Sequence, residues 1–498
     1  MIRVSFLKFR PRRWRGYPLP SPNMNILYLH SHDTGRSIEP YGCPVQTPAL
    51  QKLAESACLF RHAHCAAPTC SPSRAALLTG QSAHGAGMVG LTHRGSSLKY
   101  PERHLANFLK ELGFLTHKSG LSHVGGPDAL HGYLETAAVD TQDGSQVVAD
   151  AVAFLKQQDG SRPFFLDAGF FDTHRTIDGR HGFSQPFHSP GDGDGNPDYV
   201  QVPATLPDTP ETRRDWLDFR HSVERLDRFY GEILHALDAS GQADNTLVLV
   251  TTDHGIAFPQ HKCSLTHRGS GVLLLLRLPA GLGRGRVFDA LVSHLDVYPT
   301  VCDLLNVPAP EWLEGRSLLP LLHGETDSVR EALFTEVTFH GAFEPKRGIR
   351  TKRWCYIRNY ATPHNTILPN CDNGLSKQLF LHHGWADHPV ASEELYDLLF
   401  DPMEQHNLVG SDECEEGNAE CGVRSAEWLA ALEDLRKRLD AWMKETDDPL
   451  LHPDPSVLPL PQRVNTWDQL QPGADTSREW EPSEWKSLYV PASVNKLV

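Results

Sequence analysis

Along the chain, short and mostly apolar runs alternate with longer segments whose apolar residues have helical spacing. The apolar runs predict buried strands at Ile26–Leu29, Phe164–Phe170, Thr246–Thr252 and Val272–Leu276. Strands that are apolar at nearly successive positions, interleaved with helices, are typical of a mostly parallel sheet covered on both faces, so we expect an α/β domain over residues 24–330. The predicted helices are Pro48–Ala57, His104–Leu112, Gln146–Gln157, Thr212–Ala239 and Ser293–Leu305.

The pattern changes after residue 330. Short runs at Val337–His340, Lys352–Asn359 and residues 393–398 predict further strands, and Ser425–Lys444 has the spacing of a long helix. This order favours a smaller α+β subdomain over residues 331–447. Residues 448–498 are rich in proline and tryptophan without periodicity, so we expect an extended tail there.

Charge is unevenly distributed along the chain. The formal net charge of −15 argues against general nucleic-acid binding, which requires a basic face. Residues 1–23 are instead basic and lack the apolar stretch of a secretory signal. They are either a disordered or targeting extension or a misplaced start, and we favour the second because strand-like sequence follows Met24 directly. No apolar run is long enough to span a membrane, and we expect a cytoplasmic protein.

Polar side chains directly follow three of the predicted strands. The first strand runs into His32 and Asp33, the second into Asp172–Arg175, and the third into Asp253 and His254. In open parallel sheets the ligand binds beyond the carboxyl ends of the strands. We therefore expect these side chains to meet at one edge of the sheet and to form a site.

The sequence Cys70-Ser71-Pro72-Ser73-Arg74 stands just before an alanine- and leucine-rich run that predicts a helix. Backbone N–H groups at a helix start and the Arg74 guanidinium both favour an anion. The motif resembles the signature of the type I sulfatases, in which this cysteine is oxidised to formylglycine and the hydrated aldehyde is the nucleophile. An ordinary buried cysteine beside a turn is the alternative interpretation.

A divalent cation is expected at the same edge of the sheet. Hard cations prefer carboxylate oxygens, which Asp33 and Asp253 supply at separate strand ends. The resemblance implies a divalent metal, usually calcium, held by a pair of acids after the first strand and by an acid followed by Asn or His before a glycine. In this chain His32 replaces the first acid of the pair, and His254 follows Asp253. If both imidazoles bind the metal, preference shifts towards zinc or manganese. A turn-capping imidazole is the alternative for His32.

The resemblance also implies a proton donor and sulfate-binding groups. His123 and His174 are the candidates for protonating the leaving group, because an imidazole can donate a proton near neutral pH. Lys262 lies nine residues after Asp253, where this family carries a basic residue that contacts the sulfate. We expect Arg175, beside His174, to bind the substrate as well.

The usual family pattern Gly-Lys-x-His is altered in this chain. It reads Gly120-Leu121-Ser122-His123, so a second sulfate-binding lysine is missing. Lys118 is close, but on a strand it would point to the opposite face.

The match is more specific to the heparan N-sulfatase branch of the family and spans most of residues 24–450. It rests on the Cys70 motif, on His123-Val124-Gly125, on residues 162–166 and 445–449, and on the motifs after the second and third strands. The branch implies an alkaline-phosphatase-like fold and hydrolysis of a sulfate ester or sulfamate of a sulfated sugar. It also implies a formylglycine-generating enzyme as a maturation partner, and a homodimer is an open alternative.

Two other functions stay open. The changes at His32 and Leu121 are compatible with a phosphodiester or phosphonate ester hydrolase on the same fold. They are also what a non-catalytic relative would show, although Cys70, Arg74 and Lys262 are retained.

Overall fold

The computed structural model describes residues 24–176, 195–361, 363–410 and 419–452. The strands of its larger sheet are β1 (Asn25–Ser31), β2 (Cys58–His64), β3 (Leu115–Gly120), β4 (Glu135–Thr136), β5 (Phe164–Gly169), β6 (Thr246–Thr252), β7 (Leu274–Arg277) and β8 (Val287–Ser293). They lie in the order β4-β3-β5-β1-β6-β7-β2-β8. Neighbouring strands are parallel except around β7, which runs antiparallel to β6 and β2. The expected mostly parallel sheet is confirmed.

Helices cover both faces of this sheet. They are α1 (Pro48–Ala54), α2 (Cys70–Thr79), α3 (Ala83–Ala86), α4 (Leu105–Glu111), α5 (Asp128–His131), α6 (Gly144–Gln157), α7 (Pro210–Ala239), α8 (His267–Ser270), α9 (Val297–Leu304) and α10 (Leu319–Leu322). Leu27 and Leu29 of β1 share one core with α6 and α7, whereas Ile26 and Tyr28 share the other with α2 and α9. Because both faces are buried, β1 is apolar at successive positions instead of alternating ones.

Sequence periodicity locates many of these elements but misses β2, β3 and β8. Polar residues interrupt the apolar pattern of these three strands. In β3 the polar side chains have partners within the fold. Thr116 Oγ1 donates to the Gly132 carbonyl at 2.7 Å, and the His117 ring lies between Glu135 and Asp150. The helix expected at 293–305 is wrong at its start, since β8 ends there and a 3-10 turn precedes α9.

A smaller unit follows the large sheet. Its elements are β9 (Leu333–Phe339), β10 (Phe343–Arg350), β11 (Trp354–Asn359), α11 (Leu375–His382), β12 (Glu393–Asp397) and α12 (Ala419–Glu445). The strands form an antiparallel sheet in the order β12-β11-β10-β9. Tyr356, Leu395, Leu435 and Leu439 pack together between this sheet and α12. The α+β character expected for this part is confirmed, while the boundaries at residues 330 and 447 stay predictions.

Two expected segments fall outside this description. The basic extension 1–23 and the part of the predicted tail from residue 453 onward lie outside the described residues. The start of that tail is not extended, because Pro449–Leu451 forms a short 3-10 helix and Leu450 is buried. In the part of the chain that is described, no helix has both the length and the apolar character needed to cross a membrane.

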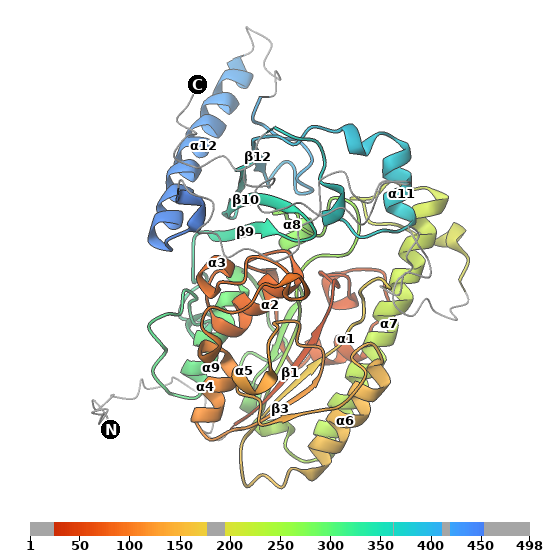
Figure 1. Ribbon diagram of the computed structural model, residues 1–498, viewed down its shortest axis with the longest axis vertical. Coiled ribbons are helices and arrows are strands. Elements are labelled where there is room, and N and C mark those ends of the chain that lie inside the picture. The colour runs from red at the N-terminus through yellow and green to blue at the C-terminus, as the bar shows by residue number, and fades with distance from the viewer. Residues whose placement is uncertain (1–23, 177–194, 362, 411–418, 453–498) are drawn as a thin grey trace.

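The two units meet beside α2. In Figure 1 this helix lies between the large sheet and β9. Backbone hydrogen bonds join the units there, because Glu336 N donates to Ala66 O at 3.0 Å and Phe339 N donates to Val89 O at 3.0 Å. The start of α2 is therefore enclosed by both units.

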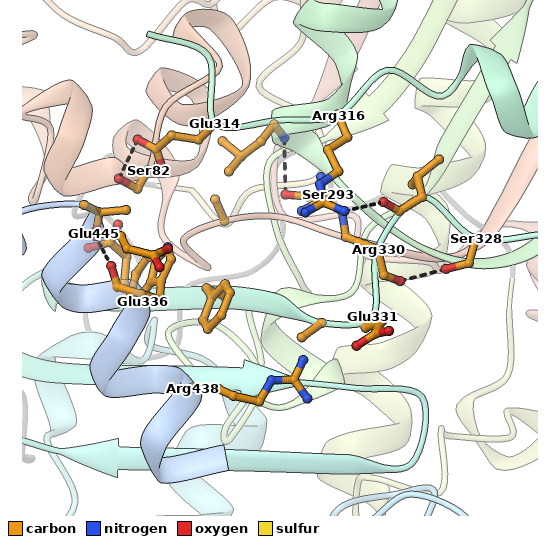
Figure 2. Close-up of a pocket in the computed structure, with 17 residues that line it drawn as sticks. Ser82, Ser293, Glu314, Arg316, Ser328, Arg330, Glu331, Glu336, Arg438 and Glu445 are labelled. Carbon is orange, nitrogen blue, oxygen red and sulfur yellow. Dashed lines mark hydrogen bonds between the residues drawn. The ribbon is translucent and has the colours of Figure 1, made fainter. Parts of the chain in front are cut away.

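A polar cavity and a chain of buried ion pairs lie at this boundary. The cavity has a volume of about 780 Å³, and Figure 2 shows Arg438 of α12 facing it together with Glu336 of β9. Glu336 pairs with His84 of α3 at 3.0 Å and with Arg347 at 3.5 Å, and Arg347 pairs with Asp448 at 2.6 Å. These pairs link the segment after α2 to the smaller unit.

Candidate active site

The candidate site lies beyond the carboxyl ends of four neighbouring parallel strands. β1 ends directly before His32 and Asp33, and β6 ends directly before Asp253. β5 leads into the turn that carries His174, and β3 leads into the loop that carries His123. Segments far apart in the sequence thus meet at the edge where parallel sheets bind ligands.

Cys70 is the first residue of α2 and lies at this edge. Its side chain is buried, and its Sγ lies 3.4 Å from His254 Nε2. Ser73 Oγ donates to the Asp253 carbonyl at 2.5 Å and ties the first turn of α2 to the end of β6. Burial raises the pKa of the Cys70 thiol well above its ordinary value. The unmodified thiol is therefore a poor nucleophile at neutral pH.

Arg74 lies one turn further along α2 and is also buried. Its Nη2 donates to Asp253 Oδ2 at 3.0 Å and to Ser31 O at 2.8 Å, and its Nη1 lies 2.5 Å from His30 Nδ1. His30 Nε2 in turn lies 2.8 Å from Asp167 Oδ1. His30 and Asp167 therefore hold the guanidinium in place. Sequence reasoning assigns neither of them a role, although a carboxylate inside the apolar run of β5 is a usable signal.

Four buried side chains at the strand ends form a compact group of ligand atoms. His32 Nδ1 lies 2.9 Å from Asp33 Oδ1 and 3.1 Å from Asp253 Oδ2. His254 Nε2 lies 3.3 Å from Asp33 Oδ1 and 3.7 Å from Asp253 Oδ2. A cation about 2.1 Å from each atom sets neighbouring ligands roughly 3.0–3.4 Å apart, so this donor set fits a divalent metal.

The charge states of these groups suit a metal. Burial lowers the pKa of His32 to about 4, so its imidazole is neutral and can be a ligand. Burial opposes ionisation of Asp33, but the charge of Lys262 holds the pKa of that carboxyl well below its ordinary value. Asp33 has a left-handed backbone conformation, with φ 58°, and its N–H donates to Asp253 Oδ1 at 2.9 Å. The two carboxylates are thus ionised and fixed against each other.

Lys262 lies on the other side of Asp33, with a side chain that is 1% exposed. Its Nζ is 3.0 Å from Asp33 Oδ2, 2.8 Å from Asp372 Oδ2 and 3.4 Å from His174 Nε2. Asp372 comes from the loop before α11 in the smaller unit. Sequence reasoning misses it, because no strand end or motif connects this loop to the site.

His123 lies on another flank of the metal-ligand group. Its ring centroid is 5.7 Å from that of His32, and it stacks on the exposed His93 with 5.6 Å between centroids. Burial lowers the pKa of His123 well below its ordinary value. Both candidate proton donors therefore border the ligand group, His174 beside Lys262 and His123 beside His32.

Two basic residues near the motifs, Lys118 and Arg175, form ion pairs outside the group of ligand atoms. Lys118 pairs with Asp128 Oδ2 at 2.9 Å, so it does not replace the lysine missing at position 121. Arg175, expected to bind substrate, is 1% exposed and forms a bidentate pair with Asp215 at 2.7 and 2.8 Å. Its guanidinium is engaged inside the protein, and the expectation of a substrate contact is corrected.

Comparisons with known proteins identify the family of this chain. Residues 24–307 match the Sulfatase family model, and residues 262–373 match the model described as N-sulphoglucosamine sulphohydrolase, C-terminal. The chain is 31% identical to human N-sulphoglucosamine sulphohydrolase over 484 residues, which cover 85% of this chain and 91% of the relative. It is 28% identical to an ulvan-active sulfatase of Formosa agariphila over 442 residues, which cover 86% of this chain and 81% of the relative.

Solved structures share the fold. A 2-O GAG sulfatase superposes with a TM-score of 0.64 at 20% sequence identity, covering 86% of this chain and 93% of the other. A protein solved in complex with its substrate D-glucosamine-2-N,6-O-disulfate has a TM-score of 0.62 at 17% identity, covering 86% and 98%. A family model matches more than half of the sequence, and the human relative is similar over most of it. The chain belongs to the sulfatase family.

Proposed function

We propose that this sulfatase hydrolyses the N-sulfate of a glucosamine unit in a sulfated sugar, releasing sulfate and a free amine. The similarity to human N-sulphoglucosamine sulphohydrolase and the match of residues 262–373 to the C-terminal model of that enzyme support this substrate class. The observation that carries the reaction class is the convergence of Cys70, Arg74 and Lys262 on one group of metal ligands.

Each side chain of the site has a task in this reaction. His32, Asp33, Asp253 and His254 would hold a divalent cation, which would supply polarisation of a sulfuryl oxygen, and formylglycine formed from Cys70 would supply the attacking hydroxyl. Arg74 is fixed by Asp253 and His30, so its charge is preorganised for the anion that develops beside Cys70. Lys262 neutralises a sulfuryl oxygen. His174, whose Nε2 lies 3.4 Å from Lys262 Nζ, delivers a proton to the leaving nitrogen. His123 is the less favoured candidate, because its lowered pKa keeps the imidazole neutral near neutral pH.

The donor set also bears on which metal the site takes. Calcium is what the family resemblance implies, but His32 and His254 offer two nitrogen ligands, whereas calcium prefers oxygens. We propose that this site prefers zinc or manganese. A formylglycine-generating enzyme is the proposed maturation partner, while a homodimer and a cytoplasmic location stay predictions.

Sulfate release tests the proposal. The protein is produced with a formylglycine-generating enzyme and assayed on N-sulfoglucosamine, 4-nitrophenyl sulfate and bis(4-nitrophenyl) phosphate, with Cys70→Ala as the control. We expect sulfate from N-sulfoglucosamine and none from the control. Faster turnover of the phosphodiester would favour the alternative hydrolase that the loss of a lysine at Leu121 leaves open. No turnover by a matured, metal-loaded protein would favour the non-catalytic relative.

A further inference from the structure

Asp372 brings a carboxylate of the smaller unit into the catalytic group. Its Oδ2 lies 2.8 Å from Lys262 Nζ. Ligand atoms of Asp33, His174 and Asp372 all lie within 4.8 Å of one another. The Asp372 side chain is 19% exposed, whereas those of Asp33 and Lys262 are almost completely buried. Oδ2 itself is buried, so the part of Asp372 that a substrate can reach is the rest of its side chain.

The loop that carries Asp372 is held firmly from within the smaller unit. The wholly buried Lys377 donates to Leu368 O at 2.8 Å, to Cys371 O at 2.7 Å and to Asn373 Oδ1 at 3.0 Å. These bonds fix the chain on both sides of Asp372. Its carboxylate is thus placed by the fold and not by chance contact with Lys262.

The larger unit anchors the same loop through Arg175 and Asp215. Asp215 Oδ2 accepts hydrogen bonds from Ser376 N at 3.1 Å and from Ser376 Oγ at 2.6 Å. Gly374 lies against the guanidinium, because a Cβ at this position would come within 2.4 Å of Arg175 Nη1. Arg175 is therefore a positioning residue for the loop that presents Asp372.

A carboxylate beside Lys262 is unfavourable for binding a sulfate group alone. It offsets the charge of the lysine and repels a sulfuryl oxygen. It favours an N–H donor or a cation instead. We propose that Asp372 recognises the leaving-group nitrogen, so that it selects a sulfamate over a sulfate ester. This inference deepens the proposed function and rests on it.

The difference between the two substrate types lies in one hydrogen. The sulfamate nitrogen carries a hydrogen that can donate to Asp372, whereas the bridging oxygen of an ester carries none and presents lone pairs. A site built to accept such a hydrogen rejects the analogue that lacks it. As an S–O bond to the attacking hydroxyl forms, the S–N bond breaks and its electron pair stays on nitrogen, which takes a proton from His174 and leaves as the amine. Asp372 then faces an amine that becomes a cation on binding one more proton.

The ratio of two activities tests the inference. Asp372→Asn keeps the shape and removes the charge, and Asp387→Asn is a matched control at an exposed aspartate of the same unit. We expect Asp372→Asn to lower the ratio of kcat/KM for N-sulfoglucosamine to kcat/KM for 4-nitrophenyl sulfate by about ten- to a hundredfold. The control should leave the ratio unchanged. An equal loss on both substrates would mean that Asp372 only holds Lys262, and would overturn the inference.

Binding without turnover gives a second, independent measurement. Calorimetry with glucosamine and with inorganic sulfate is carried out on the matured wild-type and Asp372→Asn proteins. We expect the Kd of glucosamine to rise at least about tenfold in the variant, while that of sulfate stays constant or falls. Unchanged glucosamine affinity would overturn the inference. If the wild-type protein hydrolyses neither substrate, the proposed function fails, and glucosamine binding still decides the role of Asp372.

Discussion

Replacing His32 with aspartate tests how the ligand group selects its metal. In the wild-type protein the neutral imidazole of His32 lies 2.9 Å from Asp33 Oδ1 and 3.1 Å from Asp253 Oδ2. It therefore lies between the two carboxylates without adding a charge. The variant places a third carboxylate in this buried group. Two negative charges about 4 Å apart repel each other by about 4 kcal/mol at an effective dielectric constant of about 20.

The metal-free variant should therefore be less stable than the metal-free wild-type protein by about 3–5 kcal/mol. The loss is at the lower end of this range if one of the three carboxylates takes up a proton, because protonation removes part of the repulsion. A bound cation removes the repulsion, and the variant offers calcium an oxygen in place of a nitrogen. Calcium should consequently bind His32→Asp at least about tenfold more tightly than the wild-type protein, whereas zinc should bind it more weakly.

Denaturant unfolding of chelator-treated protein, repeated after titration with calcium, manganese or zinc, measures both effects. Elemental analysis of the protein as purified identifies the metal it retains. His32→Asn is the matched control, because it removes the imidazole without adding a charge. Equal calcium affinity of the wild-type protein and His32→Asp, or equal stability of their metal-free forms, would refute the assignment of His32 as a ligand.

Two further predictions follow from buried charges. Arg74→Lys should lower kcat by about 10²–10³, because one ammonium cannot reproduce the guanidinium contacts to Asp253 and Ser31. Steady-state kinetics measure this loss, and a decrease in kcat of less than about threefold would contradict the prediction. Burial opposes protonation of His84, but Glu336 raises the pKa of His84 to about 9. This pair contributes about 1–3 kcal/mol to the free energy of unfolding. The whole contribution is present below pH 6.5, the pKa of the histidine in the unfolded chain, and it is lost as the pH rises through about 9. Denaturant unfolding between these values should show the loss, and His84→Gln should abolish it; an equally steep pH dependence in that variant would count against the pair.

Much of the fold could be predicted from one sequence because its strands are buried on both faces. Ile26–Leu29 and Leu247–Val250 are apolar at successive positions, and a parallel sheet between helix layers buries such strands on both faces. β3 escapes prediction because its polar side chains are satisfied by residues outside the strand, among them Asp150 of α6. Such partners depend on tertiary contacts that a local pattern does not contain.

The residues of the candidate site likewise fall into those that a local sequence pattern predicts and those that depend on tertiary contacts. Residues directly after strands, such as Asp33 and Asp253, could be predicted because the parallel sheet brings strand ends together. Asp372 could not, since its position depends on how the smaller unit docks through Arg175 and Asp215. The position of the Arg175 side chain could not be predicted either, because a motif that contains His174 does not show which way its neighbour points.

The state of Cys70 tests the central claim most directly. Mass spectrometry of the peptide that contains Cys70, from protein isolated from its native host or produced with a formylglycine-generating enzyme, reports whether the sulfur has been replaced by an aldehyde oxygen. We expect formylglycine at position 70 in the fraction of the protein that releases sulfate. An intact thiol in protein that is fully active would contradict it.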